Sequence, residues 1–268
     1  MDIIASSAAR VVFAASRAED WNMAELIPCC VGKSLAIQRS RRERVALPAM
    51  APFRAGPDEP METQVYRHLR QALMAGALAP GQRITSRALA DAYGLSATPT
   101  RMALHQLAGD GVLTRRERSA YQVAPANAAS YAELLEIRLR LEGLAAREAA
   151  SRIDAGKLAV VRDIQARIAR LDEGFSTYLA LNFEFHFAIY RAADMPNLLE
   201  MIGQAWTRTG PCLSYVADVF RLRDLDAPHE RIIAALAAGD GAAAEAALRA
   251  DLDGAAAALL PHIRRQDG

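Results

Sequence analysis

YRHLRQALMAGALAPGQRITSRALADAYGLSATPTRMALHQLAGDGVL, residues 66–113, is the stretch that decides the fold of this chain. Apolar residues lead into it and run through it at helical spacing, at Val65, Leu69 and Leu73. A glycine and then a Pro-Gly pair stop this pattern. The spacing therefore predicts a first helix over residues 62–75.

Two more short helices follow, with a tight turn between them. Ser86 is a suitable N-cap for a helix over residues 87–93, and Gly94 can adopt the positive φ that ends it. Ser96 is expected to cap the third helix. Pro99 stands in the first turn of that helix, where a missing N–H costs nothing.

Strand-like residues come after the third helix. Residues 112–114 and 121–123 are expected to pair as a hairpin. Three arginines lie near its tip: Arg115, Arg116 and Arg118. Three helices followed by a basic hairpin are the layout of a winged helix-turn-helix, which places its third helix in the major groove of DNA. The sequence thus predicts a DNA-binding domain over residues 60–126.

DNA recognition needs side chains at the N-terminal end and exposed face of the third helix, with cations near the phosphates. Arg101 can form a bidentate contact with guanine, and Arg87 can reach a phosphate or a base from the second helix. The alternative for both is an ordinary solvated charge. The predicted DNA-contacting residues are Arg87, Thr98, Thr100, Arg101, Arg115, Arg116 and Arg118.

The composition is that of a soluble two-domain protein. The chain has 268 residues, of which 52% are hydrophobic and 24% charged, and it has no apolar run long enough to span a membrane. Its three cysteines lack metal-type spacing, which favours a reducing compartment and a cytoplasmic location. The side-chain charge is +4 over residues 60–126 and −4 over residues 127–268, which fits a DNA-contacting domain carried by one that does not touch DNA.

Residues 1–59 show no sustained periodicity. They contain an arginine-rich run at residues 39–44 and several prolines, so we expect a disordered extension. An additional DNA-binding arm is the alternative. Translation from Met50 or Met61 is a further hypothesis for this segment.

After residue 127 the pattern changes to amphipathic helices alone, which predicts an all-α bundle over residues 127–268. The helices are expected at residues 129–151, 155–171, 176–192, 195–217, 221–238 and 241–264. Four polar residues fall at positions expected to be buried: Asn182, His186, His229 and Asp251. Two imidazoles, a carboxylate and an amide oxygen can form a metal site in a bundle core. Satisfied core groups, with Asp251 at the surface, are the alternative.

The motifs of the N-terminal half resemble those of the GntR family of bacterial transcriptional regulators. They are Leu78-x-Pro80-Gly81, Leu89-Ala90, Gly94-Leu95-Ser96-x-Thr98-Pro99-x-Arg101-x-Ala103-Leu104 and Leu107-x3-Gly111-Val112-Leu113. The resemblance implies that Arg87 and Arg101 contact an operator. Three positions depart from the family pattern: Ala97 replaces an arginine, Met102 a glutamate and Ala120 a wing glycine. We therefore expect a different base preference on the same fold.

Residues 129–264 resemble the FadR-type C-terminal domain called FCD. The motifs are Arg138-x3-Glu142-x3-Ala146, Asn182-x2-Phe185-His186, Asn197-x-Leu199 and His229-x2-Ile232-x6-Gly239-Asp240. The resemblance implies a divalent metal bound by an Asp or Asn and three histidines. Asp251 stands where the third histidine is expected, and a carboxylate can ligate Zn, Ni or Mn. It also implies that Arg138 faces a ligand pocket and pairs with a carboxylate; an interhelical salt bridge is the alternative.

The sequence thus predicts a homodimeric repressor that is not an enzyme. Two recognition helices about 34 Å apart would bind an inverted-repeat operator, and a small carboxylate effector would change their spacing. One alternative is a metal-dependent enzyme with an appended DNA-binding domain, although HExxH and nucleophile motifs are absent from the sequence. Another is a nucleoid-type DNA-binding protein whose helical half only dimerises.

Overall fold

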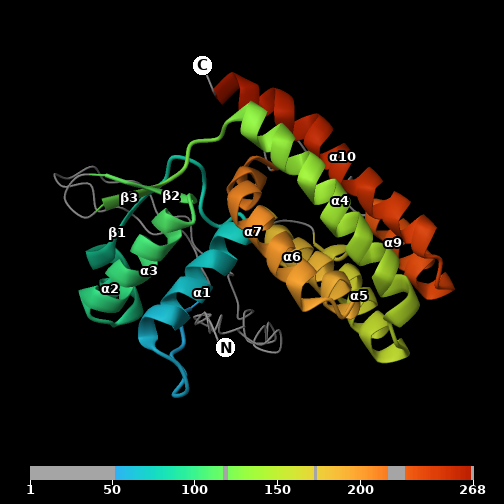
Figure 1. Ribbon diagram of the computed structural model, residues 1–268, viewed down its shortest axis with the longest axis horizontal. Helices are drawn as coiled ribbons and strands as arrows, with labels where there is room; N and C mark the ends of the chain where they lie inside the picture. The colour runs from blue at the N-terminus through green and yellow to red at the C-terminus, as the bar shows by residue number, and fades with distance from the viewer. Residues whose placement is uncertain (1–51, 117–119, 172–173, 217–226, 267–268) are drawn as a thin grey trace, which may run out of the picture.

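The computed structural model describes residues 52–116, 120–171, 174–216 and 227–266, and it contains a small N-terminal α/β domain and a larger helical domain (Figure 1). The mainly α fold class is confirmed. Three predicted features lie outside the described residues. They are most of the N-terminal extension, the wing-tip residue Arg118, and residues 221–226 of the fifth helix expected in the bundle.

The N-terminal domain has three helices and a three-stranded antiparallel sheet. Its elements are α1 (Met61–Met74), β1 (Arg83–Thr85), α2 (Ser86–Tyr93), α3 (Ala97–Gly109), β2 (Leu113–Arg115) and β3 (Ala120–Val123). The strand order is β1-β3-β2, so the expected wing hairpin forms and a third strand joins it. Sequence reasoning missed β1 because three residues are too few to show strand alternation.

The start of α2 differs from the expectation. The N-cap is Thr85 and not Ser86: the Thr85 hydroxyl accepts a hydrogen bond from the backbone N–H of Ala88, at 3.1 Å. Ser86 is the first residue inside the helix. Gly94 ends α2 with φ +66°, as predicted.

The domain core also extends beyond the predicted boundary. Phe53 packs against the core of this domain, and its ring stacks on Tyr93 with centroids 4.8 Å apart. Gln64 of α1 binds the backbone of Gly56, accepting from its N–H at 2.7 Å and donating to its carbonyl at 2.9 Å. The segment just before residue 60 is therefore structured, which corrects the prediction of an extension through residue 59.

In the described part of the C-terminal domain, every element of regular secondary structure is a helix. Its elements are α4 (Ala128–Arg152), α5 (Ala155–Ile168), α6 (Phe175–Ala192), α7 (Pro196–Thr209), the 3-10 helix η4 (Gly210–Tyr215), α9 (Ala227–Ala238) and α10 (Gly241–Gln266). The expected helix over residues 195–217 is divided in two, because Pro211 lacks the N–H that a continuing α-helix needs. The long helices α4 and α10 lie side by side (Figure 1).

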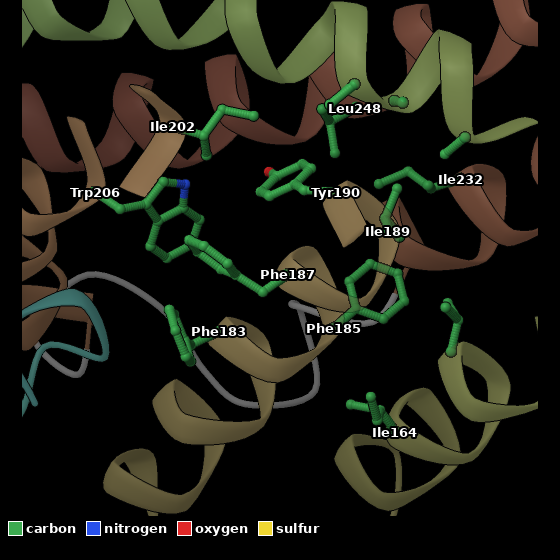
Figure 2. Close-up of a cluster of buried hydrophobic side chains, with 14 of the residues drawn as sticks. Ile164, Phe183, Phe185, Phe187, Ile189, Tyr190, Ile202, Trp206, Ile232 and Leu248 are labelled. Atoms are coloured by element: carbon green, nitrogen blue, oxygen red, sulfur yellow. The ribbon is translucent and has the colours of Figure 1, made fainter. Parts of the chain in front are cut away.

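Helix α6 is the centre of this domain. Every residue from Leu181 to Phe187 is buried, so neighbouring helices cover this part of α6 on all sides. Phe183 and Phe187 pack against Trp206 of α7, while Phe185 points toward the α5 side, near Ile164 (Figure 2). Polar side chains on α6 are consequently held in an apolar surrounding, where each one needs a partner.

The two domains contact each other through α1. Its C-terminal end packs against α7 and η4, and Met74 belongs to the hydrophobic core of the helical domain. Across the described residues, the helices are all too short or too polar to cross a membrane.

Candidate functional site

The exposed residues at the start of α3 form the first candidate site. Thr98 and Arg101 are both exposed to solvent there, and so is Arg87 on α2. Met102, which departs from the family pattern, is 51% exposed and stands next to Arg101 on the same helix. Side chains that are free to reach out from the N-terminal end of a recognition helix have the placement that contacts to base edges need.

Thr100 has a different role from the one predicted. It is completely buried, and its hydroxyl lies 3.0 Å from the carbonyl oxygen of Ser86 and 3.1 Å from that of Ala97. This side chain joins α3 to the start of α2 and does not face solvent. The prediction that Thr100 contacts DNA is therefore wrong, because the period of the helix turns this position toward the core.

The wing contributes two described arginines. Arg115 is exposed at the end of β2. Arg116 is also exposed, and its Nε donates a hydrogen bond to Oε1 of Gln122 on β3, at 2.9 Å. That bond orients the guanidinium beside the hairpin.

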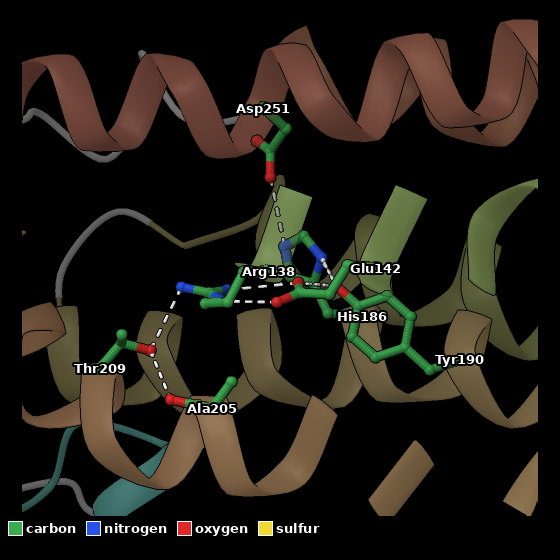
Figure 3. Close-up of polar contacts among 7 residues, drawn as sticks. All are labelled: Arg138, Glu142, His186, Tyr190, Ala205, Thr209 and Asp251. Atoms are coloured by element: carbon green, nitrogen blue, oxygen red, sulfur yellow. Dashed lines mark hydrogen bonds and ion pairs between the residues drawn. The ribbon is translucent and has the colours of Figure 1, made fainter. Parts of the chain in front are cut away.

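A group of metal-ligand type, made of two buried histidines and a half-buried aspartate, is the second candidate site. His186 of α6, His229 of α9 and Asp251 of α10 each offer a ligand atom, and these atoms lie within 4.8 Å of one another. Nε2 of His186 is 3.3 Å from Oδ2 of Asp251 (Figure 3). The fold has thus brought together three of the four predicted metal donors from three helices.

Each histidine also makes a polar contact through its Nδ1 atom. Nδ1 of His229 lies 2.8 Å from Oε1 of Gln165, and Nδ1 of His186 lies 3.2 Å from the Tyr190 hydroxyl. Because an amide oxygen only accepts, this hydrogen bond forms in the tautomer that has the proton on Nδ1, which leaves the lone pair on Nε2. A ligand histidine fixed by its other ring nitrogen is the usual arrangement in metal sites.

The charge states also suit a metal. Burial lowers the pKa of His229 to about 4, so its imidazole is neutral at physiological pH. Burial acts to raise the pKa of Asp251, but the hydrogen bond with His186 and the positive charge of Arg138 act against it, and this pKa is held below its usual value. A neutral imidazole and an ionised carboxylate are the forms that bind cations.

Asn182, the fourth predicted donor, lies one turn before His186 on α6. Its side chain is buried, and its Oδ1 accepts a hydrogen bond of 3.4 Å from the Tyr178 hydroxyl. In this structure the amide oxygen is thus engaged by its own helix.

Arg138, the predicted effector-binding residue, is buried in an ion pair. Its Nε donates to Oε1 of Glu142 at 2.5 Å, and its Nη1 donates to the Thr209 hydroxyl at 3.4 Å (Figure 3). The guanidinium lies over the Trp206 ring, 4.5 Å from the centroid. Burial acts to lower the pKa of Arg138, but the ion pair and hydrogen bond with Glu142 raise it above its ordinary value. The salt-bridge alternative therefore describes this structure, within α4 and not between helices.

Tyr190 connects the two buried groups. Its hydroxyl donates a hydrogen bond to Glu142 and also contacts His186. Sequence reasoning missed Tyr190, although its position four residues after His186 on one helix face was a usable signal. Gln165, Trp206 and Thr209 were missed as well, and they come from helices whose approach no local pattern indicates.

The chain matches two family models. Residues 61–123 match the model described as "Bacterial regulatory proteins, gntR family", and residues 133–264 match the FCD domain. The HTH-type transcriptional regulator McbR of Escherichia coli is 32% identical over 182 residues, which are 66% of this chain and 82% of McbR. The chain belongs to the GntR family.

Further comparisons agree with this membership. The solved structure of E. coli McbR/YncC has a TM-score of 0.73 and 28% identity, covering 76% of this chain and 99% of that one. The "Probable D-xylose utilization operon transcriptional repressor" of Paenarthrobacter nicotinovorans is 29% identical over 212 residues, 77% of this chain and 90% of its own. This GntR-family chain is a DNA-binding transcriptional regulator, and its FCD domain is a ligand-binding regulatory domain.

Proposed function

We propose that this GntR-family regulator is a cytoplasmic homodimeric repressor that leaves its operator when a small carboxylate binds in the FCD domain. It carries out no catalysis. The observation that carries the proposal is the buried network of Arg138, Glu142, Tyr190, His186 and Asp251, which concentrates ligand-binding groups in the domain attached to an exposed recognition helix.

The proposed DNA contacts follow from exposure and charge. Arg101 and Thr98 at the start of α3 are proposed to contact base edges. Arg87, Arg115 and Arg116 are exposed cations on neighbouring elements and are proposed to contact the backbone. Because phosphate contacts release counterions, operator affinity should fall steeply with salt concentration.

Replacing Arg101 tests the recognition helix. We expect Arg101→Ala to weaken operator binding by about 5- to 150-fold, because a bidentate contact to guanine contributes about 1–3 kcal/mol of discrimination. The probe is a duplex selected from a randomised library by the wild-type protein, and binding is followed by fluorescence anisotropy. Arg162→Ala, which removes an exposed arginine of α5, is the matched control. Unchanged affinity and base preference in Arg101→Ala would contradict the assignment.

The carboxylate effector is supported by the position of Arg138. Its guanidinium is the buried cation of the FCD domain's polar network, and it is already paired with a carboxylate, that of Glu142. An anionic ligand that competes with Glu142 would change the contacts of Arg138 with Trp206 and Thr209. The same anisotropy assay, repeated with a panel of carboxylate metabolites, tests this. A ligand that releases the wild-type protein from the operator should act much more weakly on Arg138→Lys, because lysine lacks the planar guanidinium that pairs with a carboxylate through two hydrogen bonds. Equal release of both proteins would exclude Arg138 as the residue that binds the ligand.

A divalent metal fits the donors that the structure brings together. Two ligands of one tetrahedral ion, each about 2.0–2.1 Å from it, lie roughly 3.3 Å apart. The separation of His186 Nε2 and Asp251 Oδ2 is 3.3 Å. We propose that these residues and His229 hold Zn, Ni or Mn, with Asn182 as a fourth donor if its amide leaves Tyr178. Such an ion would supply positive charge for an anionic ligand.

Removing one donor tests the metal proposal. We expect wild-type protein to bind about one Zn²⁺ per chain in equilibrium dialysis. Asp251→Ala should weaken that binding by more than about 100-fold, because loss of an outer-shell partner alone costs about 10- to 100-fold. Asp253→Ala, an exposed carboxylate two residues along the same helix, is the control. Ni²⁺ and Mn²⁺ are measured in parallel, and equal binding by the two variants would exclude the site.

The dimer interface is proposed on α4. Apolar residues recur along this helix at intervals of three and four, which is the spacing of a seam between two helices. They are Leu134, Ile137, Leu141 and Leu144. Ile137 is 43% exposed and Leu144 is 40% exposed, while the two others are half-buried. An apolar row left open along a long helix suits the same row on a second copy of this chain.

A charge placed in this row tests the interface. We expect Ile137→Glu to convert the dimer to a monomer in sedimentation velocity and to weaken binding to a full inverted repeat more than to a half-site. Val160→Glu, at a 55% exposed position on α5, should leave the dimer intact. A dimer that survives Ile137→Glu would place the interface elsewhere.

A further inference from the structure

Arg70 belongs to the DNA-binding domain but makes its contacts in the FCD domain. It is only 8% exposed on α1. Its Nε donates to the Thr207 hydroxyl at 3.2 Å, and its Nη2 donates to Oε1 of Glu200 at 3.0 Å. Both partners are on α7. One side chain thus makes a charge-assisted connection across the domain boundary.

The backbone on the two sides of this boundary comes unusually close. A Cβ added at Gly210 would lie 2.4 Å from the carbonyl oxygen of Leu73 and 2.7 Å from Cα of Met74. A Cβ at Gly203 would lie 2.9 Å from Nη2 of Arg70. At Gly203 the close atom is the movable end of a side chain, whereas at Gly210 it is fixed backbone, so only glycine fits at position 210. The contact of α1 with η4 is therefore sterically defined.

Helix α1 is also attached to the recognition helix. The Tyr66 hydroxyl donates to Oδ2 of Asp110, the C-cap of α3, at 2.8 Å. Leu69 of α1 belongs to the same buried core as Leu104 and Leu107 of α3. A shift of α1 therefore carries α3 with it.

The other side of α7 faces the buried ligand network. Trp206 lies under the guanidinium of Arg138, and its ring centroid is 5.6 Å from that of His186. Thr209 accepts a hydrogen bond from Arg138. Thr207, the partner of Arg70, is the next residue after Trp206. Helix α7 is thus in direct contact with both the ligand network and α1.

We propose that Arg70 is the positioning residue through which α7 sets the orientation of α1 and the recognition helix. This inference rests on the proposed function, because it describes how a change at Arg138 and His186 reaches the DNA-binding domain. A ligand that displaces Arg138 from Trp206 and Thr209 moves α7, and the contact of Arg70 with Thr207 and Glu200 passes that movement to α1.

Hydrogen–deuterium exchange of the full chain tests the connection without operator or effector. Arg138→Lys perturbs the ligand network while retaining a cation for Glu142. We expect it to speed amide exchange in α7 and in α1 by about fivefold or more, the lower end of ordinary coupling between sites. In an Arg70→Met background the same change should still speed exchange in α7 but leave α1 unchanged.

Arg67→Met is the matched control, because Arg67 is on the same helix but pairs with Glu59. The experiment compares how much Arg138→Lys speeds amide exchange in α1 in the two backgrounds. An effect as large in the Arg70→Met background as in the Arg67→Met background would overturn the proposal. No response in α7 would overturn it as well. If Arg70→Met folds poorly, Thr207→Val takes its place as a milder change on the other side of the contact. It should also reduce the α1 response.

Gly210→Ala provides a second measurement. It replaces none of Arg70, Thr207 and Glu200, but it forces α1 away from η4 and so separates Arg70 from its partners on α7. It should therefore also abolish the α1 response. A full response in this variant would count against the proposal. Amide exchange is measured without DNA, so a chain that failed to bind its operator would still give a result. Failure of the proposed function can therefore be distinguished from failure of the connection through Arg70.

Discussion

The buried ion pair between Arg138 and Glu142 is the interaction on which the rest of the FCD domain depends. Two charges removed from water need close contact and further hydrogen bonds, since a lone buried charge costs several kcal/mol. Here Tyr190 of α6 supplies a hydroxyl to Glu142, while Thr209 and Trp206 of α7 contact Arg138. The requirement to satisfy one pair on α4 thus fixes how α6 and α7 approach it.

The same requirement places the histidines. Tyr190 is shared between Glu142 and His186, so the metal-type group and the ion pair form one network and not two separate sites. This network of charged groups lies in an apolar core, where each hydrogen bond affects its neighbours. Because α7 borders both this network and α1, a local change there lies one helix away from the DNA-binding domain.

Local features were predictable where a local rule applies. The helices, Gly94 at its positive φ, and the wing hairpin follow from periodicity and turn chemistry. Errors occurred where neighbours in space decide the outcome. Thr100 has a polar side chain at a position suited to DNA contact, yet its helix face turns it inward against α2. Phe53 stands among prolines but has Tyr93 to pack against.

The sequence by itself determined that this chain is a GntR-type winged helix-turn-helix followed by a helical FCD domain, because motifs and hydrophobic periods are local properties. The sequence also predicted His186, His229 and Asp251 as metal ligands. Only the tertiary structure decided that these three groups meet, that Arg138 is paired with Glu142, and that Arg70 contacts α7. Those outcomes depend on helices far apart in the chain packing at particular angles. Packing depends on the complementarity of whole surfaces, which no local pattern records.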